Sequence, residues 1–160
     1  HWFDIVRCFL KDQQIKRVFA STARVPGQTL MPSLLAQTLI EFENAQSTLS
    51  FDASVTFGSL EETYNAGTRG SLLRTGAGNQ QQVLTVTVEQ GRWTPELEGK
   101  WFPDGFHGTM GELLCAIEDK RPCSISAADN LSSLALCFAA LASAESGVPI
   151  VPGSIRKLPD

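Results

Sequence analysis

The chain has 160 residues, and 42% of them are hydrophobic, which is enough to build one globular domain around a core. The formal net charge is -4 and Lys and Arg do not cluster, which argues against a nucleic-acid-binding surface. The longest apolar stretch, residues 131–144, is interrupted by three serines and is too short to span a bilayer, so we expect a soluble protein with no membrane partner.

Residues 1–11 predict an amphipathic helix. Phe3, Val6 and Leu10 lie on one stripe, and charged residues lie on the other. No Ser, Thr, Asp or Asn precedes His1 to cap the first turn, so we expect the chain to be a fragment of a larger protein that starts within this element.

Alternating apolar and polar residues then predict about six strands. Their ranges are 15–24, 34–43, 46–55, 62–67, 71–75 and 82–89. A short turn at Asn44-Ala45 joins the second and third strands, and Thr68-Arg69-Gly70 joins the fourth and fifth. The connections are too short for parallel crossovers, so the sheet should be mainly antiparallel. One of its faces is rich in Thr, Ser and Gln, which suits either water or self-association.

Two further helices are predicted. The first starts after Asp104 as its N-cap and ends near residue 118. Its expected buried side chains are Phe106, Met110, Leu113, Leu114 and Ile117. The second is capped by Ser126, with Asp129 as a capping-box partner, and ends at Gly147. Its expected buried side chains are Leu131, Leu134, Ala135, Phe138, Leu141 and Ala142. The three helices can cover one face of the sheet, which predicts a two-layer α+β domain. The tail, 149–160, should be extended and loosely packed.

The cysteine pattern predicts no metal site. The cysteines are Cys8, Cys115, Cys123 and Cys137. No two of them have Cys-x-x-Cys spacing, and neither histidine lies beside one. All but Cys123 fall on or near apolar helix stripes, so we expect buried free thiols. Free thiols favour a reducing compartment and a cytoplasmic location.

No catalytic motif is complete. The segment 76–81 has two glycines of a dinucleotide fingerprint, but it precedes a predicted strand and is interpreted as a turn. His1 starts the first helix, with Asp4 one turn further on. His107 lies in the segment 101–108, which combines aromatic side chains with a helix start, as small-molecule sites often do. Core packing is the alternative interpretation of Trp101 and Phe102.

Four segments in this order resemble a known family. They are residues 1–7 (HWFDIVR), 67–72 (GTRGSL), 102–114 (FPDGFHGTMGELL) and the stretch from 126 to 152. Together they resemble the carboxy-terminal domain of the Gfo/Idh/MocA oxidoreductases, named for glucose-fructose oxidoreductase and inositol dehydrogenase. The resemblance covers essentially the whole chain.

The resemblance implies a dihydrodipicolinate-reductase-like fold, with residues 1–160 as a substrate-binding and oligomerisation domain. An amino-terminal Rossmann domain, absent from this chain, would bind NAD or NADP and supply a lysine, so the chain itself should hold no cofactor. His1 and Asp4 match the last two named positions of the family motif Asp-x-Gly-x-His-x-x-Asp. The family's His transfers the proton of the substrate hydroxyl, which makes His1 the expected catalytic residue.

We therefore expect a sugar, polyol or similar carbinol as substrate, with Trp101, Asp104 and His107 as candidate contacts. A homo-oligomer should form through the open sheet face around Gln46, Thr48 and neighbouring residues, and the chain alone should not turn over. Two alternatives remain open. One is a stand-alone interaction module that uses the open sheet face, and the other is a family member that has lost catalysis.

Overall fold

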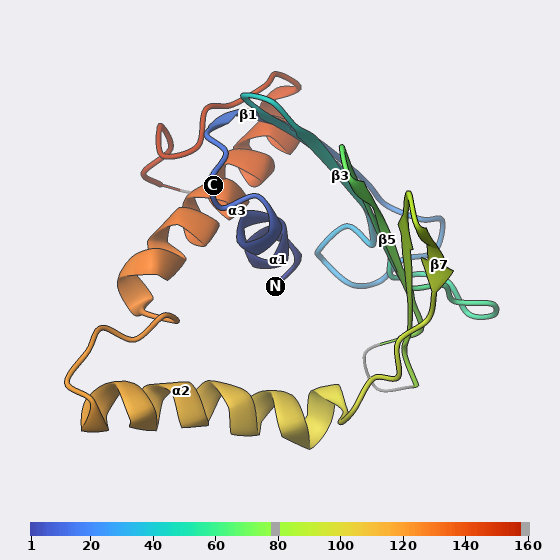
Figure 1. The fold of residues 1–160 in the computed structure, drawn as a ribbon. Helices are drawn as coiled ribbons and strands as arrows, with labels where there is room; N and C mark the ends of the chain where they lie inside the picture. The colour runs from blue at the N-terminus through green and yellow to red at the C-terminus, as the bar shows by residue number, and fades with distance from the viewer. Residues whose placement is uncertain (78–80, 158–160) are drawn as a thin grey trace. The chain divides into compact units, whose positions relative to one another are not determined.

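A computed structural model describes residues 1–77 and 81–157 of the chain (Figure 1). It divides into two compact units. The first comprises His1–Val55 and Ser126–Asp160, and the second comprises Thr56–Ile125. Each unit has its own antiparallel sheet and its own helices.

The first unit is a three-stranded sheet covered by two helices. Its elements are α1 (Trp2–Phe9), β1 (Ile15–Ala23), β2 (Leu35–Phe42), β3 (Gln46–Asp52) and α3 (Ala127–Ser146). The strands pair in the order β1-β2-β3, with Val18 opposite Ile40 and Ile40 opposite Ser47. Helices α1 and α3 lie on the same side of this sheet (Figure 1). The predicted first helix and first three strands are confirmed.

The core of the first unit forms between α3 and the sheet. Val18, Ile40 and Leu136 are fully buried, and Val6 of α1 joins them. The buried residues of α3 are Ser133, Leu136, Ala139, Ala140, Ala142 and Ser143. Most of these side chains are small, which lets the helix approach the strands closely.

The predicted buried stripe of α3 is wrong in its three leucines, whereas Phe138 is half-buried and Ala142 is buried as predicted. Leu131, Leu134 and Leu141 are 66%, 45% and 50% exposed. Alanine and serine repeat at the same helical spacing as leucine in this segment, so periodicity alone did not identify the stripe that meets the sheet. The predicted ends are confirmed. Ser126 Oγ accepts the Asp129 N–H at 3.2 Å, and Gly147 ends the helix at φ 71°. The Asp129 carboxylate bonds Arg7 instead of closing a capping box.

The tail of the chain is held more firmly than predicted. Val18 and Ile150 exchange two backbone hydrogen bonds of 2.8 Å, which form an antiparallel bridge on the outer edge of β1. Ser143 Oγ accepts the Ala20 N–H at 3.0 Å and donates to the Val148 carbonyl at 2.7 Å. The described part of the tail therefore covers a strand edge that would otherwise be open.

The second unit is a four-stranded antiparallel sheet followed by a helical segment. Its elements are β4 (Glu62–Gly67), β5 (Gly70–Thr75), β6 (Val83–Val88), β7 (Gly91–Trp93), the short kinked turn η1 (Trp101–Gly105), in which Phe102 is extended, and α2 (Phe106–Glu118). The strand β7 was not predicted, because three residues are too few to show alternation. The α+β class and the antiparallel pairing are confirmed, but the structure divides seven strands between two sheets where one sheet of about six was predicted.

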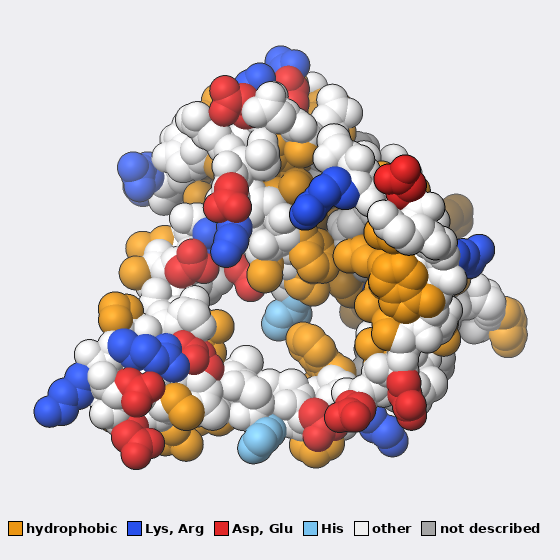
Figure 2. Space-filling view, viewed as in Figure 1, with side chains coloured by type: hydrophobic (Ala, Val, Ile, Leu, Met, Phe, Trp, Pro, Cys, Tyr) orange, Lys and Arg blue, Asp and Glu red, His pale blue; other side chains and the backbone are white. Residues whose placement is uncertain are grey.

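Helix α2 begins close to the predicted position, but its predicted burial and cap are wrong. Its large apolar side chains are exposed, and Figure 2 shows hydrophobic side chains at the surface along it. Only Ala116 of this helix is buried. Gly105 occupies the N-cap position, while Asp104 Oδ2 accepts the Lys100 N–H at 2.6 Å. The apolar stripe of a helix shows which face can be buried, and it carries no information about what covers that face.

Helix α3 is the one described helix that is long and apolar enough to cross a membrane by length and composition. It has 20 residues and is longer than the apolar stretch 131–144 on which the sequence prediction rested. Leu136 and Ala139 of this helix belong to the core against the sheet. A core helix of a soluble protein passes the same test, so the finding is weak evidence for a membrane.

All four cysteines are free, but the predicted burial is wrong for two of the three cysteines to which it applied. Cys8 and Cys115 are exposed, whereas Cys123 and Cys137 are half-buried. Burial raises the pKa of the Cys137 thiol above its ordinary value, because the thiolate is less well solvated there.

Candidate functional site

His1 stands at the start of α1 with its side chain exposed to solvent. It occupies the N-cap position without a capping side-chain hydrogen bond, and its carbonyl accepts the Ile5 N–H at 2.9 Å. The ring of the adjacent Trp2 packs against Phe51 of β3, with centroids 6.3 Å apart. The first turn of α1 is therefore held against the sheet while the imidazole stays accessible.

Asp4 lies one turn after His1, as predicted, and its partners are on other parts of the first unit. Asp4 Oδ1 accepts the Ser133 hydroxyl at 2.5 Å, and Arg7 Nη1 lies 3.6 Å from the same oxygen. Arg7 Nη1 also donates to Ser133 Oγ at 2.7 Å, and Arg7 Nη2 donates to Asp129 Oδ1 at 3.1 Å. We call Asp4, Arg7, Ser133 and Asp129 the α1–α3 cluster.

The sequence analysis did not predict this cluster. Arg7 and Ser133 are 126 positions apart and lie on two separately predicted helices. Helical spacing places Asp4 and Arg7 on neighbouring turns of α1. No local pattern indicates that a serine near the start of a distant helix would lie between them.

The second group of predicted site residues lies around η1 and the start of α2. Asp104 closes the turn through its bond to the Lys100 N–H, and a Cβ at Gly99 would lie 3.2 Å from its carboxylate. Gly99 has φ +79°, which favours glycine at this close approach. Asp104 Oδ1 makes no hydrogen bond to a described residue.

Three aromatic rings contact one another in this segment. The centroids of Trp101 and Phe102 are 6.4 Å apart, and those of Phe102 and Phe106 are 5.0 Å apart. Trp101 is 53% exposed and Phe102 is 59% exposed, so the alternative interpretation of both as core residues is wrong. His107 is exposed on the first turn of α2. Trp101, Asp104 and His107 thus share one exposed segment of the second unit, while His1 belongs to the first unit.

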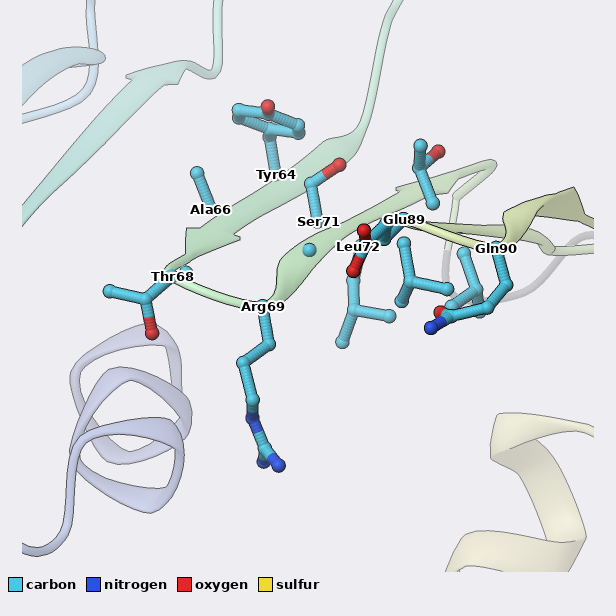
Figure 3. A pocket seen from close by; sticks show the side chains of 13 residues that line it. Tyr64, Ala66, Thr68, Arg69, Ser71, Leu72, Glu89 and Gln90 are labelled. Atoms are coloured by element: carbon cyan, nitrogen blue, oxygen red, sulfur yellow. The ribbon is translucent and has the colours of Figure 1, made fainter.

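A broad hollow of about 1020 Å³ lies at one end of the second sheet (Figure 3). The β4–β5 and β6–β7 turns form it, with Arg69 extending from the first turn and Glu89 from the second. Gly70 is required at this end, since its φ is +153° and a Cβ would clash with the backbone carbonyl oxygen of Thr87. None of the predicted site residues lines this hollow, and its lining includes no histidine or cysteine.

The strands that flank the glycine segment do not have the arrangement of a dinucleotide site. Residues 78–80 lie outside the described residues, but the flanking elements are clear. β5 ends at Thr75 and β6 begins at Val83, and the two strands are antiparallel neighbours. A dinucleotide fingerprint needs a parallel strand followed by a helix, so the interpretation as a connection between strands fits the structure. Within residues 1–77 and 81–157, no group of three His, Cys, Asp or Glu side chains could hold a metal ion.

No family model matches the sequence, and no curated protein does so. Solved structures do match, and those described below are oxidoreductases. The aldose-aldose oxidoreductase from Caulobacter crescentus, complexed with glycerol, has a TM-score of 0.77 at 15% identity, over 93% of this chain and 44% of its own. An oxidoreductase from Agrobacterium radiobacter, in complex with NAD⁺, L-tartaric acid and magnesium, has a TM-score of 0.76 at 23% identity, over 95% of this chain and 47% of its own.

The WlbA dehydrogenase from Bordetella pertussis, in complex with NADH and UDP-GlcNAcA, has a TM-score of 0.69 at 17% identity, over 94% of this chain and 43% of its own. The chain thus spans less than half the length of these proteins. At these identities the likeness establishes the fold. The chain has the α+β fold of part of these oxidoreductases, which confirms the fold predicted from the resemblance to Gfo/Idh/MocA carboxy-terminal domains.

Proposed function

We propose that this chain is the substrate-binding and oligomerisation domain of an NAD(P)-dependent oxidoreductase that acts on a sugar, polyol or similar carbinol. The observation that carries the proposal is the match of almost the whole chain to less than half of several oxidoreductases. The complexes of those proteins contain glycerol, L-tartaric acid or UDP-GlcNAcA, all of which carry hydroxyl groups. This supports a hydroxyl-bearing substrate for the present chain.

The described residues do not form the parallel strand-turn-helix arrangement of a Rossmann dinucleotide site. Both sheets are antiparallel, and the glycine segment connects two strands instead of opening a helix. We therefore assign NAD or NADP to a separate amino-terminal Rossmann domain of the whole protein. Exposed apolar side chains on α2 and on α3 support the presence of further protein around these helices.

In this proposal His1 is the acid/base group. Its imidazole is exposed, so a substrate hydroxyl can approach it. The start of α1 that carries it is anchored on β3 by Trp2 and on α3 by Asp4. Trp101, Asp104 and His107 are the proposed substrate contacts. The Trp101 ring offers an apolar face to a sugar ring, while Asp104 Oδ1 and the His107 imidazole can bond its hydroxyls.

The open face of the first sheet is the proposed oligomer interface. Gln46, Thr48 and Ser50 of β3 are exposed, as are the directly paired Phe19 and Leu39. This face has an apolar centre, and its charged residues Arg17 and Glu41 pair with each other, which suits contact with a second copy. We expect Phe19→Glu to dissociate the oligomer in size-exclusion chromatography with light scattering, whereas Lys11→Glu in an exposed position outside the sheet should not.

Two experiments test the catalytic proposal. In the whole protein, His1→Ala should lower kcat by about 100- to 10,000-fold, as loss of a general acid/base does, whereas His107→Ala should act mainly on KM. Unchanged turnover of His1→Ala would remove His1 from the mechanism. In the 160-residue chain alone, tryptophan fluorescence should show no micromolar binding of NADH, and clear binding would contradict the placement of the cofactor.

A second candidate is a stand-alone interaction module that uses the same sheet face. The exposed Phe19 and Leu39 pair favours it, since such a pair also suits a different protein partner. The encoding gene separates the two candidates. A Gly-x-Gly-x-x-Gly strand-turn-helix and a Glu-Lys-Pro segment upstream of His1 in the same frame support the oxidoreductase, and a start codon immediately before His1 supports the module.

We also propose a cytoplasmic location. All four cysteines are free, and two of them are exposed, which suits a reducing compartment. Fractionation of cells that express the whole protein tests this, with the membrane and secreted fractions as the contradicting outcomes.

A further inference from the structure

The α1–α3 cluster links two helices of the first unit through polar side chains. It joins the start of α1 to the start of α3 through three charged groups, Asp4 and Arg7 of α1 and Asp129 of α3, around the buried hydroxyl of Ser133. Ser133 is 5% exposed, and the side chain of Arg7 is 18% exposed. The side chains of Asp4 and Asp129 are 57% and 56% exposed, so the buried part of the cluster is the contact of Arg7 with Ser133. Charge-assisted hydrogen bonds such as these are short and directional.

The chemistry of the groups fixes the direction of each hydrogen bond. A guanidinium has only N–H donors, so Ser133 Oγ must accept from Arg7 Nη1. The hydroxyl proton of Ser133 is then directed to Asp4 Oδ1, which accepts it at 2.5 Å. Arg7 Nη2 and Nη1 also donate to the Asp129 carboxylate and carbonyl, which fixes the guanidinium plane. Ser133 is thus the one group that both accepts from Arg7 and donates to Asp4.

This arrangement bears directly on the position of His1. Asp4 lies in the first turn of α1, and the Ile5 N–H bonds the His1 carbonyl at 2.9 Å, so His1 moves with that turn. We propose that Ser133 is a positioning residue for His1. Through Asp4 and Arg7 it holds the first turn of α1, which carries His1, against α3. The inference rests on the proposed function, in which His1 exchanges a proton with the substrate. Small displacements of an acid/base group reduce turnover steeply, which is why the anchor matters.

Ser143→Ala is the matched control for Ser133→Ala. Both serines are buried on α3 and each makes two hydrogen bonds, but Ser143 bonds β1 and the tail instead of α1. A general loss of stability should therefore appear in both variants, and a loss of α1 anchoring should appear only in Ser133→Ala.

The first test is amide hydrogen exchange in the 160-residue chain. Relative to the amides of β2, Ser133→Ala should speed exchange in residues 5–9 by about 10-fold or more, because local opening of α1 becomes easier. Ser143→Ala should not change this ratio. Equal ratios in the two variants, or no increase in Ser133→Ala, would overturn the proposal without bearing on the oxidoreductase assignment.

The second test is turnover in the whole enzyme. Ser133→Ala should lower kcat by about 10- to 100-fold with unchanged affinity for the cofactor, and Ser133→Thr, which keeps the hydroxyl, should recover most of it. Ser143→Ala should retain kcat within about two-fold. If Ser133→Ala keeps the wild-type kcat while His1→Ala inactivates the enzyme, the positioning role of Ser133 is overturned and the acid/base role of His1 is not. If His1→Ala also keeps turnover, the acid/base role of His1 fails and the positioning role fails with it.

Discussion

Ser143 Oγ accepts a hydrogen bond from the backbone N–H of Ala20 at 3.0 Å, so a helix side chain binds the edge of a strand. Two residues earlier on the same edge, Val18 pairs with Ile150 through two backbone bonds of 2.8 Å. Ser143 and the tail therefore occupy positions on the outer edge of β1 where a fourth strand could otherwise pair. Ser143 also ties this edge to the tail through the Val148 carbonyl.

Replacing Ser143 by Ala should lower the free energy of unfolding by about 1–3 kcal/mol, because the fully buried site then leaves an N–H and a carbonyl without this partner. Urea denaturation of the 160-residue chain measures the change. Ser132→Ala is the control, since Ser132 is exposed on the same helix and alanine favours helix formation. Equal losses in both variants would contradict the edge role of Ser143.

Leu136→Ala should destabilise the chain far more than Leu134→Ala. Leu136 is fully buried against the sheet, so its truncation should cost about 2–5 kcal/mol. Leu134 is 45% exposed, and its truncation should cost about 0.5 kcal/mol or less. Chemical denaturation of the two variants side by side decides which face of α3 packs on the sheet. The opposite ranking would restore the face predicted from the sequence.

The order of helices and strands could be predicted because each depends on local information. The strand β3 alternates along its whole length, and Ser126 and Gly147 mark the two ends of α3 by capping chemistry. The buried face of α3 could not be predicted in the same way, because alanines and serines compete with leucines for it. Which stripe is buried depends on how closely a distant sheet can approach, which is a property of tertiary packing.

The candidate site shows the same division. His1, Asp4 and His107 were identified from their positions at helix starts, and the structure places all three in the first turns of α1 and α2. Ser133 and Asp129 were missed as site residues, because their contacts with Arg7 join segments more than 120 positions apart. Asp104 was expected to cap α2, but a five-residue turn, η1, intervenes and uses its carboxylate to close on Lys100.

Cys137 should be the less reactive thiol when compared with the exposed Cys8. Burial raises its pKa, so a smaller fraction is thiolate near neutral pH, and the thiolate is the form that reacts with alkylating agents. Site-resolved mass spectrometry after iodoacetamide treatment, from about pH 7 to 9, should show Cys8 modified first and Cys137 rising only at the alkaline end. In denaturing urea both should react alike. Equal rates in the folded chain would contradict the burial of Cys137.

Glu112 should make the end of α2 sensitive to acid. Arg121 donates two hydrogen bonds, of 2.8 and 2.9 Å, to the Glu112 carboxylate, and these are the main reason that the pKa of Glu112 lies well below its ordinary value of 4.5. A hydrogen bond of 2.8 Å from the Ser124 N–H lowers the pKa further. A carboxylate with a lowered pKa in the folded state stabilises that state above its ordinary pKa and loses this contribution as the pH falls below it. Glu112→Gln should therefore melt at a lower temperature than the wild type at about pH 6, and the difference should shrink steadily below about pH 4.5.

Glu118→Gln is the matched control for this prediction. Glu118 lies on the same helix, is exposed, and makes no ion pair with a described residue. Its replacement should leave the melting temperature and its pH dependence close to those of the wild type, because no folded-state partner is lost. If the difference between Glu112→Gln and the wild type stayed constant from about pH 6 to pH 3, the ionised carboxylate would not be the source of the stabilisation. The contact between Glu112 and Arg121 would then stabilise the fold through packing of the long Arg121 side chain.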